Sequence, residues 1–314
     1  MPIGLVEITA AGSKAADWVT GQRLFESLVQ PFAGLALRGV VLGIAAADLE
    51  AGTAPVVYAS TLIAVIKGWR GRGQIGDFAV AIAGLDSAAT GAAAAQYRLA
   101  QLALLPRPFA DAGSVDTTAV VPRYEPNTSV RETGRRLALA LCNTAYAKER
   151  PVWAWPPPTY TTATVDAHTF TVCFAAYGDS APTIALTDAP GCPGCCASGG
   201  GGLLQAMSAG SSWANATSLT QARPRNTPSS ACITATFDPA ASVREVRFGL
   251  SDGPPGCIAL DASKLPPYPF IWTSTAARDV LAQPTSVRTP GTAVTAQDGA
   301  APVLPPMGYN TWNR

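Results

Sequence analysis

The sequence contains few charges and almost no histidine. Charged residues make up 14% of the 314 positions and the formal net charge is +1. The chain therefore lacks the clustered basic charge with which proteins bind nucleic acid or anionic membranes. A single histidine leaves little imidazole for general-base catalysis. No uninterrupted apolar run reaches the about 20 residues that a membrane-spanning helix needs, so neither nucleic-acid binding nor a membrane span is expected.

Alanine, glycine and proline are abundant instead. Hydrophobic residues make up 48% of the chain, but many of them are alanines, which bury little apolar area on folding. The 29 glycines and 27 prolines indicate numerous turns and irregular connections. A length of 314 residues is compatible with two domains.

The first half of the chain alternates between predicted strands and predicted helices. Its expected strands are short apolar runs suited to a buried parallel sheet, namely Ile3–Ile8, Leu37–Ile44 and Phe78–Leu85. Its expected helices carry apolar residues at helical spacing, namely Val56–Trp69, Ala92–Leu105 and Ser129–Tyr146. Such alternation is typical of a doubly wound α/β sheet.

The second half follows a different pattern, which begins after the three prolines at 156–158. Short segments of alternating hydrophobicity predict antiparallel strands at Thr159–Val165, Thr169–Ala176, Ala231–Phe237 and Ser242–Leu250. The stretch 191–212 is rich in glycine and cysteine, and it predicts a surface loop inserted between these strands. From residue 275 to 305 the prolines, threonines and alanines predict a linker.

The segment Pro31–Asp48, PFAGLALRGVVLGIAAAD, resembles a motif of the sialate O-acetylesterase family, P-F-A-G-M-A-L-R-G-V-[IV]-W-Y-Q-G-E-[SA]-N. The apolar first part agrees almost letter for letter, whereas Leu42–Asp48 replaces the polar second part. Further segments resemble the same family in the same order, namely Pro2–Trp18, Tyr58–Phe78, Tyr97–Gln101, Gly134–Leu139 and Val246–Phe270.

The resemblance implies an α/β architecture in three parts. Residues 1–150 would form a partial SGNH-hydrolase-like parallel sheet with helices, and residues 151–274 a β-rich, sandwich-like domain with its insertion near 191–212. Residues 275–314 would be a linker that ends in the start of a glycosidase, because Leu304–Asn313 resembles the P-P-M-G-W-N-S-W-N opening of α-galactosidase catalytic domains. Since the chain starts directly at a predicted strand, we expect an N-terminally truncated protein; a compact variant with a shortened sheet is the alternative.

Most catalytic groups that the resemblance calls for are missing from the printed sequence. Such an esterase needs a serine nucleophile, a histidine base and donors for the oxyanion. The family's G-Q-S-N-M turn is not found, and Asp116–Pro126, where its histidine would lie, contains none. The relic oxyanion positions are Gly12, which is kept, and Asp48, which replaces an asparagine. An ionised carboxylate there would repel a developing oxyanion.

Other reactive residues favour structural interpretations. His168 follows Asp166, which permits a catalytic dyad, but its hairpin-like context favours an exposed turn. Ser13 has no histidine partner in the sequence around it, and Asp77 belongs to a turn expected to be structural. Gly199–Gly202 is not a phosphate-binding loop, because no Lys-Ser or Lys-Thr pair follows it.

The seven cysteines allow two interpretations. The spacing of Cys192, Cys195 and Cys196 suits a zinc site, but the expected four ligands are not grouped in the sequence. A disulfide-bearing insertion in an exported protein is the favoured alternative, with at least one thiol left over. Two glycosylation sequons, which start at Asn127 and Asn215, agree with export.

These expectations combine into a sialate O-acetylesterase-like protein. Its inherited activity would be the hydrolysis of acetyl esters on sialic acid or other sugars, and its partner an acetylated sugar or glycan. This chain is expected to be inactive, and no cofactor or metal is implied. The family implies a secreted, lysosomal or vacuolar location, although Met1–Glu7 does not resemble a signal peptide. The alternative is a non-catalytic carbohydrate-binding or interaction protein, in which Trp153, Trp155 and Tyr160 stack on sugar rings unless they pack a domain junction.

Overall fold

The computed structural model describes most of the chain up to residue 274. The described residues are 6–35, 37–72, 78–85, 89, 91–102, 104, 118–121, 123, 130–146, 159–175, 184–189, 192–198, 202–207, 212–222, 230–238, 243–252, 255–261 and 264–274.

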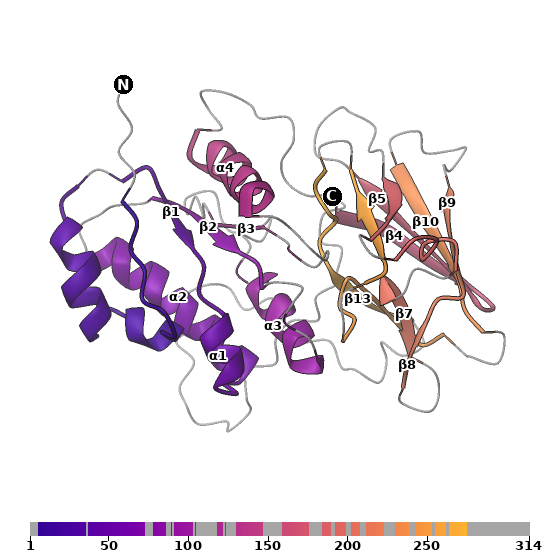
Figure 1. Cartoon of the computed structure of the whole chain (residues 1–314), viewed down its shortest axis with the longest axis horizontal. Coiled ribbons are helices and arrows are strands. Elements are labelled where there is room, and N and C mark those ends of the chain that lie inside the picture. Colours follow the sequence, from indigo (N-terminus) through magenta and orange to yellow (C-terminus); the bar gives the residue numbers. More distant parts are fainter. Residues whose placement is uncertain are drawn as a thin grey trace, which may run out of the picture.

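A three-stranded parallel sheet forms the centre of the first half (Figure 1). Its strands are β1 (Gly39–Leu42), β2 (Ala79–Ala83) and β3 (Thr118–Val121), in this order across the sheet. The helices of this half are α1 (Ala46–Glu50), α2 (Pro55–Arg72), α3 (Ala92–Leu102) and α4 (Val130–Tyr146). Short helical turns precede β1, namely η1 (Ala15–Trp18), η2 (Phe25–Val29) and η3 (Gln30–Phe32).

Helices cover both faces of this sheet because β2 is apolar on both of its faces. Val80 and Ile82 belong to one hydrophobic core with residues of α2 and α3. Ala81 points to the opposite face and packs against Ala140 of α4. Gly39 lets α4 lie close to β1, since a Cβ atom at this position would come within 2.9 Å of Leu141. The first half is therefore a three-layer α/β unit.

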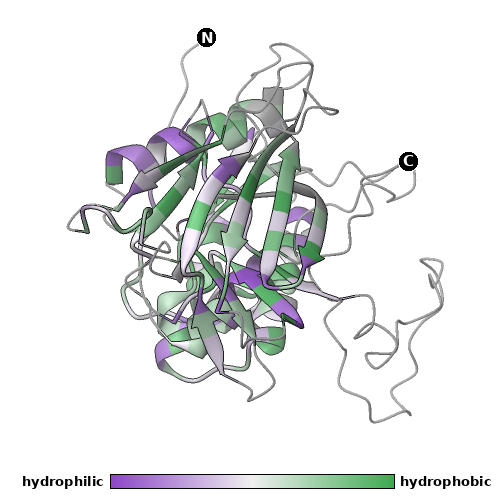
Figure 2. Cartoon of the chain, turned by 90° about the vertical axis from the view of Figure 1, so that its right-hand side faces the viewer, coloured by the Kyte–Doolittle hydropathy of each residue, from purple (hydrophilic) through white to green (hydrophobic). Residues whose placement is uncertain are grey.

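The second half is built from antiparallel strands. They are β4 (Thr159–Asp166), β5 (Thr169–Ala175), β6 (Ala185–Asp188), β7 (Leu204–Met207), β8 (Trp213–Asn215), β9 (Ser218–Ala222), β10 (Ser230–Thr236), β11 (Glu245–Phe248), β12 (Cys257–Leu260) and β13 (Phe270–Thr273). Two four-stranded sheets, β4-β5-β10-β9 and β13-β11-β7-β8, enclose a shared core, and β12 pairs with β6. Figure 2 shows apolar and polar residues alternating along the strands that face the viewer, as expected for a sheet with one buried face.

The core of this sandwich is rich in phenylalanine. The rings of Phe174 and Phe248, which come from different sheets, lie 5.5 Å apart, and Phe248 stacks on Phe270 at 5.3 Å. Phe170 contacts Trp272 at 5.2 Å. Aromatic side chains bury large apolar areas, so these rings account for much of the packing between the two sheets.

One segment, residues 265–270, connects the hydrophobic cores of both halves. Leu265 is fully buried against Ala81 and Ala140, on the α4 side of the parallel sheet. Tyr268 belongs to the core on the α2 and α3 side, and Phe270 to the core of the sandwich. The side chains of this short stretch therefore help to pack the two halves together, alongside a second contact in which Ala95 and Leu99 of α3 meet Leu250 and Ile271.

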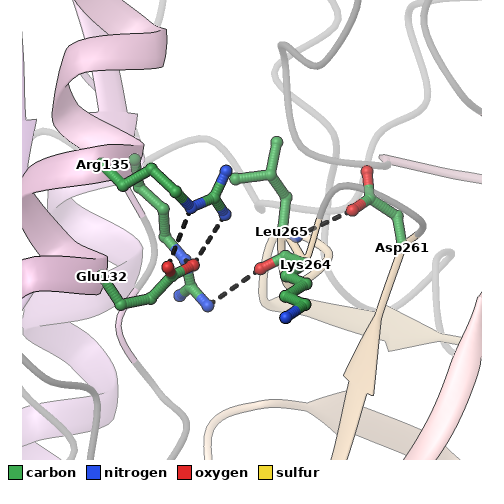
Figure 3. Close-up of polar contacts among 6 residues, drawn as sticks. Glu132, Arg135, Asp261, Lys264 and Leu265 are labelled. Carbon is green, nitrogen blue, oxygen red and sulfur yellow. Dashed lines mark hydrogen bonds and ion pairs between the residues drawn. The ribbon is translucent and has the colours of Figure 1, made fainter.

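Polar contacts fix the start of this segment, as Figure 3 shows. Arg136 of α4 donates a hydrogen bond to the carbonyl oxygen of Lys264 at 2.9 Å, and Glu132 accepts from Arg136 at 3.0 Å and from Arg135 at 2.7 Å. The backbone amide of Leu265 donates to the Asp261 carboxylate at 2.7 Å. These bonds satisfy polar groups that the junction buries.

Most of the sequence-based elements are confirmed in type. The strands expected at Leu37–Ile44 and Phe78–Leu85 correspond to β1 and β2, and the three expected helices correspond to α2, α3 and α4. The four expected antiparallel strands correspond to β4, β5, β10 and β11. The mixed α/β class therefore holds, while the domain limits at 150 and 274 stay a prediction.

Two expectations were wrong. Val6–Ile8, the described end of the expected strand Ile3–Ile8, are not in a strand, and no described strand pairs with β1 on its other side. Without a neighbouring strand, an extended segment has no partner for its backbone hydrogen bonds. The loop expected at 191–212 contains β7, a central strand whose Leu204 and Ala206 are fully buried.

We predict that Leu265→Ala lowers the free energy of unfolding by about 2–5 kcal/mol, because it opens a cavity where α4, β2 and the second half meet. Urea denaturation of the full chain, followed by tryptophan fluorescence, measures this loss. Val130→Ala is the matched control, since Val130 is 89% exposed and its truncation should change stability by less than about 0.5 kcal/mol. Equal effects of the two substitutions would contradict the role given to Leu265.

Candidate functional site

Asp48, which the family resemblance assigns as a relic oxyanion position, lies at the carboxyl edge of the parallel sheet. Three residues after β1 ends, the chain enters α1, and Asp48 is in the first turn of this helix. In open α/β sheets the carboxyl ends of the strands form the rim at which ligands bind. Asp48 is nevertheless only 3% exposed, and its carboxylate accepts a hydrogen bond from the backbone amide of Ala15 at 2.7 Å.

The second relic position, Gly12, belongs to the turn that this hydrogen bond holds in place. Gly12 is exposed and has a φ angle of +71°, a left-handed conformation that glycine adopts without strain. Ser13 donates through its hydroxyl to the carbonyl of Ala10 at 2.7 Å and accepts from the indole Nε1 of Trp18 at 2.9 Å. The structure thus brings the turn that carries Gly12 to Asp48, and it gives Ser13 a structural role.

Two tryptophans hold the same turn against α2. Trp69 donates through Nε1 to the carbonyl of Trp18 at 2.8 Å, and their ring centroids lie 6.4 Å apart. Gly68 permits this close approach, because a Cβ atom there would come within 2.2 Å of the Thr20 hydroxyl. The segment 10–20 is therefore held at two points, by Asp48 at Ala15 and by Trp69 at Trp18.

A buried polar network lies behind the rim. Tyr58 of α2 donates to the carbonyl of Ile44 at 2.5 Å, and its hydroxyl accepts from the Gln101 amide of α3 at 3.0 Å. Gln101 also accepts from the backbone amide of Leu85, just after β2, at 2.8 Å. The ring of Tyr97 lies tilted against that of Tyr58 at 4.8 Å, and its hydroxyl donates to the carbonyl of Thr53, after α1. Tyr58 and Gln101 are thus bound to backbone that follows β1 and β2.

The same network sets the ionisation of its two tyrosines. Burial raises the pKa of Tyr58 well above its usual value, the hydrogen bond from Gln101 acts in the opposite direction, and the negative charge of Asp48 raises it further. Burial and the charge of Asp48 also raise the pKa of Tyr97. Both phenols therefore stay neutral at physiological pH, and neither is activated as a base or nucleophile.

The arrangement offers acceptors rather than donors at this rim. The carboxylate of Asp48 can only accept hydrogen bonds when it is ionised, and the Ala15 amide that faces it is already bound. Stabilisation of an oxyanion requires donors aimed at the developing charge. The described contacts of Asp48 are therefore suited to holding the turn at 10–15 in place.

The only histidine of the sequence lies elsewhere, in the second half. His168 follows Ala167, which has a φ angle of +49°, in the hairpin between β4 and β5. Its carbonyl accepts a hydrogen bond from the amide of Phe237 at 2.9 Å, and the residue is half-buried rather than exposed. The turn expected from the sequence is confirmed, although its exposure is lower than expected.

Several further candidates lie outside the described residues. They are Asp77, Gly199, Trp153, Trp155, the sequon at Asn127, most of the region Asp116–Pro126 and the glycosidase-like tail Leu304–Asn313. The side chain of Tyr160 is not described either, although its backbone is part of β4.

Six of the seven cysteines form disulfides. Cys173 and Cys232 lie directly opposite each other on β5 and β10, Cys196 is bonded to Cys257, and Cys192 to Cys195. Cys142 is unpaired and exposed. The disulfide interpretation is thus favoured over zinc, and within the described residues no group of three or more His, Cys, Asp or Glu side chains is placed to hold a metal ion. The pairing of Cys173 with Cys232 depends on the register of β5 and β10, which the sequence alone does not reveal.

The network of Tyr58, Tyr97 and Gln101 was not identified as a site from the sequence. Its one local signal is the spacing of Tyr97 and Gln101, which lie one helical turn apart on the same face of α3. The partners on α2 and at the end of β2 are set by tertiary packing. A polar pair on an otherwise buried helix face is the pattern that indicates such a network.

Comparison with known proteins shows a shared fold. No protein-family model and no curated protein match the sequence. The structure is similar to the crystal structure of a carbohydrate acetylesterase from Xanthomonas citri, with a TM-score of 0.60 and 19% sequence identity over 84% of this chain. The match covers 59% of that protein, so this chain spans about three fifths of its length. In the described part of the chain, no helix combines the length and apolar character needed to cross a membrane.

We predict that Asp48→Ala lowers the free energy of unfolding by about 1–3 kcal/mol, because the buried amide of Ala15 loses its acceptor. Asp48→Asn keeps a side-chain oxygen at the same place and should lose less than half as much. Urea denaturation of both variants tests the difference. Equal losses would show that the hydrogen bond to Ala15 does not hold the turn.

We also predict that Tyr58→Phe makes stability less sensitive to alkaline pH. A pKa raised in the folded state means that stability is fully present below the ordinary tyrosine pKa of about 10 and falls above it. Removing the Tyr58 hydroxyl removes this contribution, so the decline above pH 10 should be shallower, although stability at pH 7 is also lower. Urea midpoints between pH 7 and 11 provide the test, with Cys142 alkylated to prevent disulfide exchange. If the urea midpoints of the original chain and of Tyr58→Phe fell in parallel above pH 10, the prediction would be wrong.

Proposed function

We propose that this chain is a sialate O-acetylesterase-like protein, whose inherited reaction is the hydrolysis of acetyl esters on sialic acid or other sugars. We further propose that residues 1–314 do not carry out this reaction alone. The motif-by-motif resemblance in the first 270 residues supports the lineage, and the fold shared with a carbohydrate acetylesterase agrees with it. The proposed domain limits are 1–150, 151–274 and 275–314.

One observation carries the proposal of inactivity, namely the hydrogen bond between Asp48 and Ala15. The sialate O-acetylesterase motif has an asparagine at the place of Asp48, and the resemblance implies that the amide of this asparagine donates to the oxyanion. Here a buried carboxylate accepts from the neighbouring turn instead, and its charge disfavours a second negative charge beside it. Ile44 and Ala46 take the places of two further polar residues of the motif, so these two positions do not supply groups that orient a sugar.

General-base catalysis is the second missing part. The single histidine is in the β4–β5 hairpin, whereas Gly12 and Asp48 are on the parallel-sheet side of the molecule. The tyrosines nearest to Asp48 have raised pKa values and are bound to backbone carbonyls. An attacking hydroxyl at this rim would find no described side chain poised to take its proton.

The alternative function is glycan binding without hydrolysis. A sugar-binding protein needs shape and hydrogen-bonding groups but no nucleophile, so a scaffold of this kind can lose catalysis and still bind. The two functions differ in a simple way: an esterase releases acetate, and a binding protein retains an acetylated sugar unchanged.

We predict that the purified chain releases no acetate above the uncatalysed rate from a chromogenic acetyl ester or from O-acetylated sialic acid. Asp48→Asn should be equally inactive, because an added donor does not supply the nucleophile or the base. Acetate release that copurifies with the chain and stops after treatment with a serine-directed phosphonate would overturn the proposal. Saturable calorimetric binding of the acetylated sugar without turnover would favour the alternative function.

A further inference from the structure

We propose that Asn215 carries an N-linked glycan and that the indole of Trp213 is the surface on which the first sugar packs. The two residues are part of Trp213-Ala-Asn-Ala-Thr217, in which Asn215 and Thr217 form the sequon. Trp213 and Asn215 are the first and last residues of β8. Residues two apart on a strand point to the same face, so the ring and the acceptor amide are neighbours.

A chain of hydrogen bonds orients the side chain of Asn215. Arg247 can only donate, and its Nε donates to Oε1 of Gln205 at 2.6 Å. This fixes the orientation of the Gln205 amide, whose Nε2 donates to Oδ1 of Asn215 at 2.6 Å. The three residues face one another in the registers of β11, β7 and β8. Nδ2 of Asn215, the atom that would bear the glycan, is consequently on the side away from Gln205.

This nitrogen belongs to an exposed residue on the edge strand of the sheet. Asn215 is exposed, and no described residue accepts a hydrogen bond from its Nδ2. Strand β8 is the last strand of the sheet β13-β11-β7-β8, so a bulky substituent there does not meet another described strand. The sequon therefore lies where a glycan can be attached without disturbing the sandwich core.

Trp213 presents an aromatic surface beside this position. The guanidinium of Arg247 lies over its ring at 4.5 Å from the centroid, which holds the ring against the sheet. The opposite ring face is not covered by the guanidinium, and the residue as a whole is only half-buried. The C–H groups on one side of a pyranose ring are suited to such a π face. A sugar attached two residues further along the same strand face is within reach of it.

The modification is a group transfer with a polyprenyl-pyrophosphate-linked oligosaccharide as donor. A bond forms between Nδ2 of Asn215 and the anomeric carbon of the first sugar, the bond from that carbon to the phosphate oxygen breaks, Nδ2 loses a proton, and the polyprenyl pyrophosphate leaves. In the folded chain the Thr217 hydroxyl donates to the carbonyl of Thr236 at 3.0 Å. The sequon is thus engaged once β9 and β10 have paired, so transfer takes place before this turn has folded.

The disulfides provide independent support, because they point to the compartments in which such transfer occurs. Cys173–Cys232 and Cys196–Cys257 are both in the same half of the chain as β8. Disulfides form and persist in oxidising compartments such as the lumen of the endoplasmic reticulum. A glycan on β8 would also shield the unpaired edge of this sheet from pairing with another chain.

Mass spectrometry of glycopeptides tests the attachment. The full chain is directed into the secretory pathway of a eukaryotic host by an appended leader, and protein from both the medium and the lumen of the endoplasmic reticulum is analysed. We expect most molecules to carry a glycan on Asn215, Thr217→Ala to abolish it and Thr217→Ser to retain it. Asn127→Gln is the control, since it removes the other sequon and should leave Asn215 modified. Unmodified Asn215 in luminal or secreted protein overturns the proposal. A variant that misfolds can still be analysed for glycosylation, because transfer precedes folding.

A second measurement tests the role of Trp213. Complete enzymatic removal of the glycan should lower the melting temperature of the glycoprotein by about 2–4 °C, whereas trimming to the first sugar should leave it unchanged. In Trp213→Ala the fall on complete removal should be less than half as large, and in Trp213→Phe it should be largely kept. Because each comparison is made within one variant, the stability that Trp213→Ala itself loses cancels. Equal falls in all three proteins would show that the sugar does not pack on the indole.

Discussion

The burial of residues 265–270 between the two halves is the constraint on which the rest of the structure depends. Leu265, Tyr268 and Phe270 enter three separate hydrophobic cores within six positions. Since interiors are close-packed, none of these cores can shift without moving the other two. Arg136 and the carboxylate of Asp261 fix the backbone at the start of the segment, so the burial is obtained without unsatisfied polar groups there. The parallel sheet and the sandwich consequently behave as parts of one packed unit.

A second constraint, the burial of polar side chains at the carboxyl edge of the sheet, explains why this rim is rigid. A buried carboxylate or phenol is tolerated only where hydrogen bonds replace those lost to water. Asp48 and Tyr58 meet this requirement by binding backbone of segments 10–15 and 44–45, which closes the turn over α1. In an active acyl-transfer site, the same kind of position leaves donors free for the substrate. In this chain the described hydrogen bonds of Asp48 and Tyr58 are structural.

The sequence predicts those elements whose signal is local. The strands β1 and β2 are recognisable because a buried strand is a short apolar run. The helices α2 and α4 are recognisable because their apolar residues recur at helical spacing. Strand β7 was missed because glycines precede it and it is only four residues long, too short for a clear alternating pattern. The pairing of Cys173 with Cys232, and of Tyr58 with Gln101, depends on register and helix packing, which no local pattern records. At the site, Asp48 was found through the family motif, but its bond to Ala15 was not predictable.

The fold does not depend on polar residues at the ends of the parallel strands. Groups at the ends of parallel strands contribute little to the packing of the sheet, so apolar replacements such as Ile44 are compatible with its core. The second half depends on other forces, namely stacked phenylalanines and disulfides across strands. Its sheet β13-β11-β7-β8 keeps an ordered polar row of Arg247, Gln205 and Asn215 on the face away from the phenylalanine core. Buried or half-buried polar rows of this kind are costly unless every group is satisfied, and no described residue accepts a hydrogen bond from the last amide nitrogen of this row, Nδ2 of Asn215.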